Sequence, residues 1–511
     1  MFEQRSSIGV ANVIAVLAIV AGACGGVDDV ATPDPASNSS DETGSTSEPA
    51  PEPASESVDD TEATDVATTA APTSQADASA ATTEPLTDLG DDGIRSVPGE
   101  YATIQGAVDA AAEGDMVLVA PGVYVEAVDV ETDRLTIRGA DRDTVILDGE
   151  LELDNGIRVL GASGVVVENL TAMNYTNNGV FWIQATGYRA SYVTTYRTGD
   201  YGIYAFDSVQ GQIDHAHTVG SRDAGIYIGQ CYPCDALVTD VISANNGIGF
   251  SGTNAGGNLV IVNSDWYNNR VGIVPNSGSY ELCYPQRSTT IIGNRVWANN
   301  QPDTPAIATA LLAQGNGILV AGGIANTIER NRVDDHDRTG IGLVPYLEEF
   351  PNDDLPTEEE WLLSCDEFRL LPTAIPDDAL LWDSYDNVVR DNVVSNSREA
   401  DLAIASAGGD ISTFRNCWSG NEFTTSAPLE LQNLAPCDGA GAGDWTAGDL
   451  NVARWIGEQA GLPDEVDWRE APLPALGPHD NMDDPDTAPA RPAVDVPSTI
   501  DLDAITTPEL G

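Results

Sequence analysis

Two aspartates recur 23 residues apart in the same local setting. Asp200 opens the segment DYGIYA, and Asp223 precedes the same Gly-Ile-Tyr in DAGIYI. If successive repeats stack as coils, the two carboxylates lie one coil apart, near the spacing of the carboxylate pair in retaining glycosidases. At that separation the pKa of one of them should rise. We therefore predict Asp200 and Asp223 as candidate catalytic residues.

Three aromatic residues follow repeat glycines at the same offset. In a strand, alternate side chains face opposite sides, so Phe181, Tyr204 and Tyr227 are expected to point outward as a solvent-facing row about 10 Å long. Such a row is suited to stacking on sugar rings, and Arg222 beside Asp223 would neutralise a uronate. These four residues are the predicted substrate-binding set, and the stacked aspartates offer oxygen ligands for calcium.

An ordinary structural interpretation competes with this one. Aspartate and asparagine before glycine are common turn residues, and exposed tyrosine is common on β-surfaces.

The elements that would position these residues are coils of a solenoid. Glycines followed mostly by Ile or Val recur with a period in the low twenties, which favours a stack of short strands. The glycines are Gly156, Gly179, Gly202, Gly225, Gly247, Gly272, Gly317 and Gly340. A leucine-rich repeat would show Leu-x-x-Leu-x-Leu and helical stretches, and the sequence has neither.

A second series ends short alternating runs such as VVVEN and TIIGN. Stacked asparagine side chains are expected to bond along the axis at a corner of each coil. The series is Asn169, Asp240, Asn263, Asn294, Asn331, Asn392 and Asn416. His215 falls in the same register as Asn169 and is predicted to be a corner residue.

With these repeats, the chain from about Arg95 to Cys437 resembles the right-handed parallel β-helix (pectin-lyase-like) superfamily. The stretch YATIQGAVDAAAEGDMVLVAPGVYVE is similar to the start of pectin methylesterases and related surface proteins. The esterase segment Asp-Phe-Ile-Phe-Gly and the polygalacturonase segments are missing, so the resemblance implies a fold and not an active site. We expect an all-β parallel β-helix over residues 94–440, with a capping helix over 104–112 and a first strand over 116–119.

Inserted loops interrupt the regular spacing. SYELCYPQR and QPDTPAIATALLAQ lie between Gly272 and Gly317, and a longer insertion follows, roughly Tyr346 to Ser384. Such loops gather on one face of a solenoid, which is often the binding face. Residues 441–511 are expected to supply a second capping helix, in DWTAGDLNVARWIGEQAGL, and an extended acidic Pro-rich tail. The segment DDHDRTG around His336 suggests a solvated bend or, alternatively, a separate metal or acid/base site.

The N-terminal residues and the cysteines point to export. Residues 1–24 read as a signal peptide with a lipobox ending at Cys24, the predicted lipidation site, although an ordinary cleaved signal remains open. Residues 25–93 are rich in Ser, Thr, Pro and acid, and we predict a disordered tether. Six further cysteines suggest three disulfides, Cys231 with Cys234, Cys283 with Cys365 and Cys417 with Cys437.

The charge of the chain limits the classes of partner that it is expected to bind. The formal net charge is −59, and all 22 basic residues are Arg. Nucleic acid and anionic membrane surfaces are therefore excluded as expected partners, leaving a lipid anchor as the only membrane contact. Two functions stay open: an enzyme that cleaves or modifies extracellular polysaccharide (lyase, hydrolase or epimerase), and a non-catalytic surface rod that binds or displays glycan. The oligomeric state is not predicted.

Overall fold

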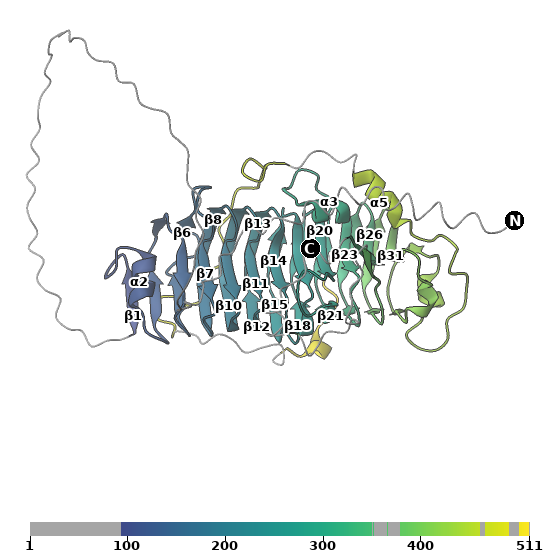
Figure 1. The fold of residues 1–511 in the computed structure, drawn as a ribbon, viewed down its shortest axis with the longest axis horizontal. Coiled ribbons are helices and arrows are strands. Elements are labelled where there is room, and N and C mark those ends of the chain that lie inside the picture. Colours follow the sequence, from purple (N-terminus) through teal and green to yellow (C-terminus); the bar gives the residue numbers. More distant parts are fainter. Residues whose placement is uncertain are drawn as a thin grey trace, which may run out of the picture. The chain divides into compact units, whose positions relative to one another are not determined.

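The structure is a computed structural model that describes residues 93–349, 351, 365, 379–459, 466–489 and 500–509. The chain winds into stacked coils whose strands pair in parallel with the coils before and after them (Figure 1). The predicted right-handed parallel β-helix is confirmed, from the first strand at Ile94 onward. Cys24 and the predicted signal peptide and tether lie outside the described residues.

Three columns of strands form the walls of the β-helix. Sheet I has eleven strands: β4 (Val128–Val130), β7 (Ile157–Leu160), β9 (Val180–Ile183), β11 (Ile203–Phe206), β14 (Ala224–Gly229), β17 (Ile248–Thr253), β20 (Val271–Asn276), β23 (Asn316–Ala321), β26 (Thr339–Val344), β31 (Ala400–Ile404) and β33 (Ser426–Ala427).

Sheets II and III are joined through two long strands, β8 (Val165–Tyr175) and β10 (Thr186–Thr198), which bend from one sheet into the other. The other strands of sheet II are β1 (Ile94–Val97), β2 (Met116–Val119), β5 (Thr136–Gly139), β12 (Val209–Asp214), β15 (Ala236–Thr239), β18 (Gly256–Val262), β21 (Arg287–Ile292), β24 (Thr327–Glu329), β29 (Val388–Arg390) and β32 (Cys417–Ser419). Those of sheet III are β3 (Gly122–Tyr124), β6 (Val145–Asp148), β13 (His217–Ser221), β16 (Ile242–Ala244), β19 (Asp265–Tyr267), β22 (Arg295–Trp297), β25 (Arg332–His336) and β30 (Val393–Ser397).

Helices and a hairpin lie outside these walls. They are α2 (Ile104–Ala110), α3 (Ala308–Ala313), α4 (Leu431–Leu434), α5 (Val452–Gln459), the 3-10 turns η4 (Ile411–Thr413) and η6 (Leu502–Ala504), and the antiparallel pair β27 (Tyr346–Glu349) and β28 (Ala379–Trp382). Between β27 and β28, within the long insertion, only Pro351 and Cys365 fall among the described residues.

The apolar residues that follow the repeat glycines stack as the inward column of sheet I, except in one coil. Ile203 pairs with Ile226, and Ile226 pairs with Phe250, not with Ile248, which follows Gly247. The repeat glycine of this coil is accordingly Gly249 and not Gly247. The segment NNGIGF holds two glycines, each followed by an apolar residue, so spacing alone chose the wrong one.

The glycines are required because the coils approach closely at this position. A Cβ on Gly249 would lie 2.5 Å from the carbonyl oxygen of Gly272, and one on Gly272 would lie 2.5 Å from that of Gly317. The contact is with backbone, which cannot rotate away.

We predict that Gly272→Ala destabilises the β-helix by about 1–3 kcal/mol, because the added methyl must push two coils apart. Gly457→Ala is the control, since it lies within α5 with nothing within 4 Å of its added Cβ. That control should be neutral or stabilising by up to about 1 kcal/mol. Urea unfolding followed by circular dichroism checks both, and equal midpoints for the two variants would contradict the close-approach argument.

Asparagine ladders run along the axis, but the predicted series mixes three positions. One ladder links successive side-chain amides and Oδ1 atoms at 2.9 to 3.0 Å, and its members are Asn294, Asn331, Asn392 and Asn421. Asn416 belongs to a second ladder, where it accepts from Asn387. The remaining members of the predicted series are left-handed corner residues, Asn169, Asp240 and Asn263, with φ of 58°, 53° and 50°.

His215 and His336 also occupy positions in the coil. His215 is a corner residue as predicted, with φ 51°. His336 is only 1% exposed, and its Nε2 lies 3.3 Å from the Asn299 amide, so this side chain is not solvated as predicted, although the chain does bend directly after it, at Asp337 and Arg338. Burial lowers the pKa of His336 to about 3, which keeps the ring neutral. It continues an internal polar column of which Asn269 and Asn299 are members.

The two ends of the core are covered differently. At the N-terminal end, α2 is capped by the Thr103 hydroxyl, and the Glu126 carboxylate accepts from the backbone of Ile104 and Gln105 at 3.1 and 3.0 Å. At the other end, α4 buries Leu431 against the last coils. The helix predicted as the C-terminal cap, α5, instead packs beside α3 on the side of the β-helix (Figure 1).

The described parts of the C-terminal tail are extended and lie against the outer wall. Wall arginines donate to tail carbonyls, such as Arg197 to Trp468 at 2.8 Å and Arg332 to Pro508 at 2.6 Å. The Met482 amide donates to Asn169 at 3.0 Å. Main-chain carbonyls are thus the main anchor points of this tail.

Candidate functional site

The predicted aromatic row exists on the outer side of sheet I. Tyr204 pairs directly with Phe181 on one side and with Tyr227 on the other. The rings of Tyr204 and Tyr227 stack with centroids 4.7 Å apart, and those of Phe181 and Tyr204 are 5.1 Å apart. The predicted vertical register is therefore present.

The row is not the solvent-facing platform that we expected. Phe181 is 7% exposed and Tyr227 is 2% exposed, while Tyr204 is half-buried. Strand alternation sets the side of the sheet on which a residue lies, but it says nothing about loops that cover that side. The aromatic rings also pack against one another through their faces, so only ring edges and hydroxyl groups are left to contact a ligand.

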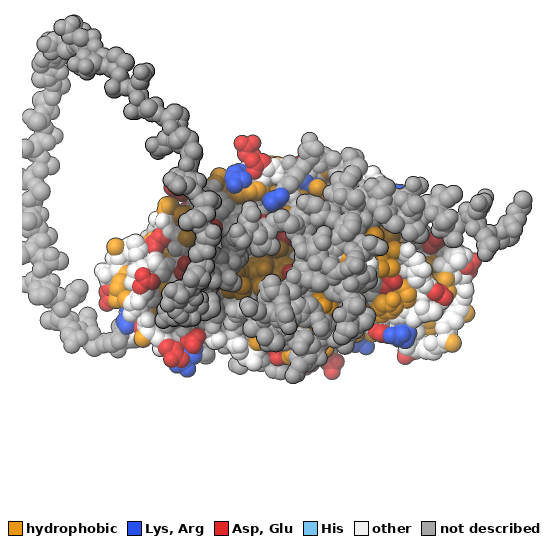
Figure 2. All heavy atoms as spheres, viewed as in Figure 1, with side chains coloured by type: hydrophobic (Ala, Val, Ile, Leu, Met, Phe, Trp, Pro, Cys, Tyr) orange, Lys and Arg blue, Asp and Glu red, His pale blue; other side chains and the backbone are white. Residues whose placement is uncertain are grey.

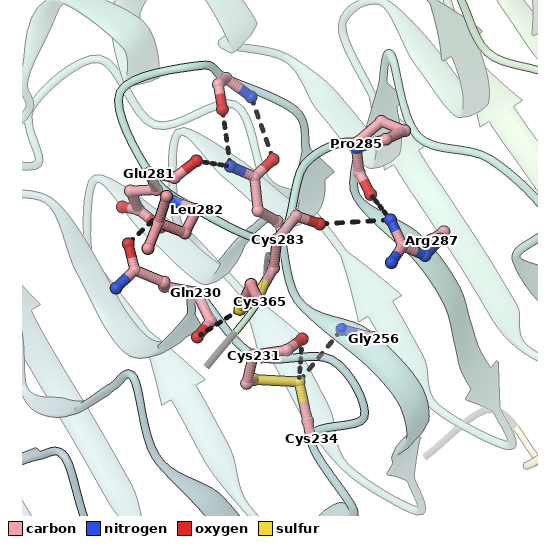
Figure 3. Close-up of a disulfide and its surroundings, with 12 residues drawn as sticks. Gln230, Cys231, Cys234, Gly256, Glu281, Leu282, Cys283, Pro285, Arg287 and Cys365 are labelled. Atoms are coloured by element: carbon pink, nitrogen blue, oxygen red, sulfur yellow. Dashed lines mark hydrogen bonds between the residues drawn. A yellow bond between two sulfur atoms is a disulfide. The ribbon is translucent and has the colours of Figure 1, made fainter. Parts of the chain in front are cut away.

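One cover is the loop between β20 and β21, which carries Glu281. Tyr227 donates a short hydrogen bond from its hydroxyl to Oε1 of Glu281. Two hydrogen bonds fix this loop to neighbouring coils (Figure 3). The Asn254 side-chain amide donates to the Glu281 carbonyl at 2.8 Å, and the Leu282 backbone amide donates to the Gln230 side chain at 2.8 Å. The next residue, Cys283, is held by a disulfide to Cys365.

All three predicted disulfide pairings are present: Cys231 with Cys234, Cys283 with Cys365, and Cys417 with Cys437.

The second cover is the loop that contains α3. Tyr201 packs against the apolar cluster to which Ala306 and Ala310 belong. Its ring lies 4.7 Å from that of Tyr204 and 4.8 Å from that of Tyr227. Both insertions between Gly272 and Gly317 therefore reach the same face, as the sequence predicted.

The two predicted catalytic aspartates lie on adjacent coils beside these tyrosines. The Asp223 amide donates to the Asp200 carbonyl at 3.0 Å, so the residues are direct neighbours along the axis. Both side chains are half-buried. Burial raises the pKa of Asp223 to about 7, the Asp200 charge raises it further, and a Tyr201 hydrogen bond and Arg222 oppose the rise. Burial also raises the pKa of Asp200, against the Arg222 charge.

Glu281 is a third carboxyl in the cluster. Burial raises its pKa to about 8, and the charge of Asp223 adds to the rise, while the Tyr227 hydrogen bond opposes it. Its Oε2 is buried and has no hydrogen-bond partner among the residues that the structure describes. A buried carboxyl oxygen without a partner is costly when ionised, which agrees with the raised pKa of Glu281.

These groups together can move protons near neutral pH. Burial raises the pKa of Tyr201, Tyr204 and Tyr227 well above the usual value, so all three keep their hydroxyl protons. A carboxyl with a pKa near 7 exchanges protons readily in both directions, and one with a pKa near 8 is a donor at neutral pH. The acid–tyrosine cluster, defined as Asp200, Tyr201, Tyr204, Asp223, Tyr227 and Glu281, has the composition of a general acid–base site.

Tyr201 and Glu281 were not singled out from the sequence. Tyr201 directly follows Asp200, and Glu281 lies in the insertion SYELCYPQR, two residues before a disulfide cysteine. The cysteine indicates that the loop is fixed, and that was the available signal. Nothing in the local pattern shows that the loop folds back over Tyr227.

Within the described ranges, no group of three or more His, Cys, Asp or Glu side chains is arranged to hold a metal ion. Calcium at the stacked aspartates stays a prediction. No helix in the described part of the chain is long and apolar enough to cross a membrane.

The outer surface carries ion-paired charges. The space-filling view shows red acidic and blue basic side chains close together at the rim of the described part (Figure 2). Arg158 pairs with Asp129 at 2.9 Å, and Arg415 pairs with Asp386. In both cases the partners come from different coils, so these pairs also fix the stacking.

Comparison with known proteins agrees with this architecture. Residues 155–346 match the family model described as "Right handed beta helix region". No curated protein matches the sequence.

Solved structures similar to this chain include polysaccharide-acting proteins. A mannuronan C-5 epimerase A-module (AlgE4) of Azotobacter vinelandii shares 15% identity, covering 66% of this chain and 93% of its own, with a TM-score of 0.44. An alginate lyase of Paenibacillus sp. shares 15% identity over 66% of this chain and 96% of its own, with a TM-score of 0.36. A pectate lyase, Pel9A, shares 11% identity over 66% of this chain and 75% of its own, with a TM-score of 0.32.

Proposed function

We propose that this right-handed parallel β-helix protein is an exported protein that binds extracellular polysaccharide on sheet I and modifies it by acid–base chemistry. The carrying observation is the acid–tyrosine cluster, in which Asp223 and Glu281 have pKa values raised to about 7 and about 8 beside hydroxyl groups that stay protonated. Export is supported by the three disulfides, which are typical of oxidising compartments.

Each residue has a distinct role in this proposal. Asp223, ionised above pH 7, takes a proton from the sugar, and its hydrogen bond with Tyr201 orients the carboxylate. Glu281, protonated below pH 8, is the proton donor, and Tyr227 fixes its Oε1. Arg222 supplies positive charge next to Asp200 and Asp223 and is suited to a sugar carboxylate.

The three reaction classes left open use the same base and acid in different steps. In elimination Asp223 takes a proton from a sugar carbon and Glu281 protonates the leaving glycosidic oxygen, whereas in epimerisation the second proton returns to that same carbon. In hydrolysis Glu281 protonates the glycosidic oxygen and Asp223 takes a proton from the attacking water. The products distinguish the classes: unsaturated ends for a lyase, new reducing ends without unsaturation for a hydrolase, and unchanged chain length for an epimerase.

A non-catalytic glycan-binding rod is the second candidate function. The low exposure of Phe181 and Tyr227 favours it, because a closed aromatic row stabilises the coil stack without any ligand. This candidate predicts binding without turnover.

The experiment uses the full-length protein on a panel of neutral and uronate polysaccharides, with calcium or with chelator. Absorbance of unsaturated products, reducing ends and the proton spectrum of the polymer are followed. The matched control is the Asp223→Asn/Glu281→Gln double variant, which keeps size and shape but removes both titrating groups. Turnover by the wild type and not by the double variant supports the proposal, whereas equal turnover, or none with any polysaccharide, contradicts catalysis at this cluster.

A further inference from the structure

A second site lies on a different wall of the β-helix. A cavity of ≈ 350 Å³ opens on the outer side of sheet III and is lined by corner residues, strand residues and the tail. Its polar lining is Asp240, Asn263, Asp265 and Arg295, and its tail residue is Pro508. None of these residues belongs to the acid–tyrosine cluster.

An aromatic stack lies further along two of the strands that line this cavity. Tyr267 and Trp297 follow Asp265 and Arg295 by two residues, so they lie on the same outer side of sheet III. Their rings stack with centroids 4.3 Å apart and planes 13° from parallel, and both side chains are half-buried. The Arg295 guanidinium lies 5.6 Å from the Trp297 ring centre, which joins the aromatic stack to the cavity.

The stack ends at Trp297. The residue paired with it on the next coil is Asp334, whose short side chain accepts from Ser395 at 2.6 Å and from Asn396 at 2.7 Å. No ring therefore continues the stack beyond Trp297 in this column. A step is left in which a sugar ring can pack on the indole while its hydroxyl groups face carboxylate and amide oxygens.

The charge of the lining selects among sugars. Arg295 donates to both carboxylate oxygens of Asp265, so this pair is close to neutral. Asp240 is exposed at the corner and contributes a negative charge to the cavity. On the next coil, Arg332 and Asp334 have opposite formal charges, so together they add no net charge beside the aromatic stack. Cationic sugars are thus favoured at this wall and polyuronates are disfavoured.

We propose that the sheet III cavity, together with Tyr267 and Trp297, is a second glycan-binding site that takes amino-sugar residues. The C-terminal segment completes it, since Pro508 forms one wall and is held there by the 2.6 Å hydrogen bond from Arg332 to its carbonyl. This site anchors the protein to a glycan and does not depend on catalysis at sheet I.

The test measures binding by calorimetry to three hexasaccharides: fully deacetylated chitosan hexamer, cellohexaose and hexagalacturonate. The protein is the full-length Asp223→Asn/Glu281→Gln variant, in which the sheet I cluster cannot turn over a ligand during the measurement. The catalytic proposal is tested by the turnover experiment above, so one proposal can fail without the other. We expect the part of the binding that Trp297→Ala removes to be strongest for the chitosan hexamer, weaker for cellohexaose and weakest for hexagalacturonate. Binding of hexagalacturonate that Trp297→Ala leaves unchanged belongs to sheet I, where Arg222 remains. Hexagalacturonate as the tightest Trp297-dependent ligand, or no binding of any hexamer, overturns the proposal.

Three further substitutions locate the site. Trp297→Ala should weaken chitosan-hexamer binding at least tenfold, whereas Tyr196→Ala, an aromatic of the same column three coils before Tyr267, should leave it within twofold. Asp240→Asn keeps the left-handed corner, which asparagine tolerates, and should weaken the cationic hexamer at least threefold with little change for cellohexaose. Unchanged binding in both Trp297→Ala and Asp240→Asn would refute the site.

Discussion

Asp223→Asn is expected to slow turnover about 10²- to 10⁴-fold, the range by which a positioned general acid or base accelerates a reaction. The amide keeps the shape of the side chain and the contact with Tyr201 but cannot take the proton. Asp200→Asn should behave differently, because the charge of Asp200 raises the pKa of Asp223. Removing that charge lowers the pKa of Asp223 and moves the acidic limb of the rate profile to lower pH, with activity retained.

The rate profile of the wild type follows from the same two carboxyls. A base with a pKa of about 7 is active above that pH, and an acid with a pKa of about 8 is active below that pH. kcat/KM should therefore follow a narrow bell-shaped profile with its maximum between pH 7 and 8. The two apparent pKa values of this profile belong to the coupled carboxyls together and not to either residue alone. A profile that is flat from pH 5 to 9, or loss of activity in Asp200→Asn but not in Asp223→Asn, would contradict the assignment.

The repeat made much of this architecture predictable. Glycine spacing, β-branched residues after each glycine and alternation within strands were enough to place Tyr204 beside Tyr227 and Asp200 beside Asp223. They succeeded because each coil imposes the same local geometry, so a residue's position within the period fixes its neighbours on adjacent coils. The capping helix α2 and the strand β2 were predictable from local pattern alone, but β2 was predicted to be the first strand, and β1 precedes it and pairs with it.

What the sequence could not show depends on contacts between distant segments. Glu281 reaches Tyr227 only because its loop folds back over sheet I, and the outer wall near Arg197 is covered by tail residues near Trp468. Periodicity contains no information about either contact. The choice of Gly247 over Gly249 failed for another reason: where two glycines lie two residues apart, both satisfy the local pattern, and only packing against Gly272 decides.

The acid–tyrosine cluster should also lower the stability of the protein as the pH rises. The pKa values of Asp223 and Glu281 are raised in the folded state, to about 7 and about 8, from ordinary values near 4. Between about pH 4 and pH 8 the folded protein therefore binds more protons at these sites than the unfolded chain does. The free energy of unfolding must fall with rising pH over that window, and the loss is complete only above the folded pKa values.

The size of this effect makes it measurable against the background of the other carboxylates. A full three-unit shift corresponds to about 4 kcal/mol, and partial hydration of these half-buried side chains reduces this to about 1–2 kcal/mol for each group.

The Asp223→Asn/Glu281→Gln double variant lacks both titrations. Its free energy of unfolding should match that of the wild type near pH 4.5 and exceed it by about 2–4 kcal/mol at pH 9. Urea unfolding at a series of pH values measures the difference, and Asp129→Asn, at an exposed ion-paired carboxylate, is the control in which no such gain at high pH is expected. A difference between double variant and wild type that does not change with pH would show that the two carboxyls titrate normally, which would also remove the physical basis for proton transfer at sheet I.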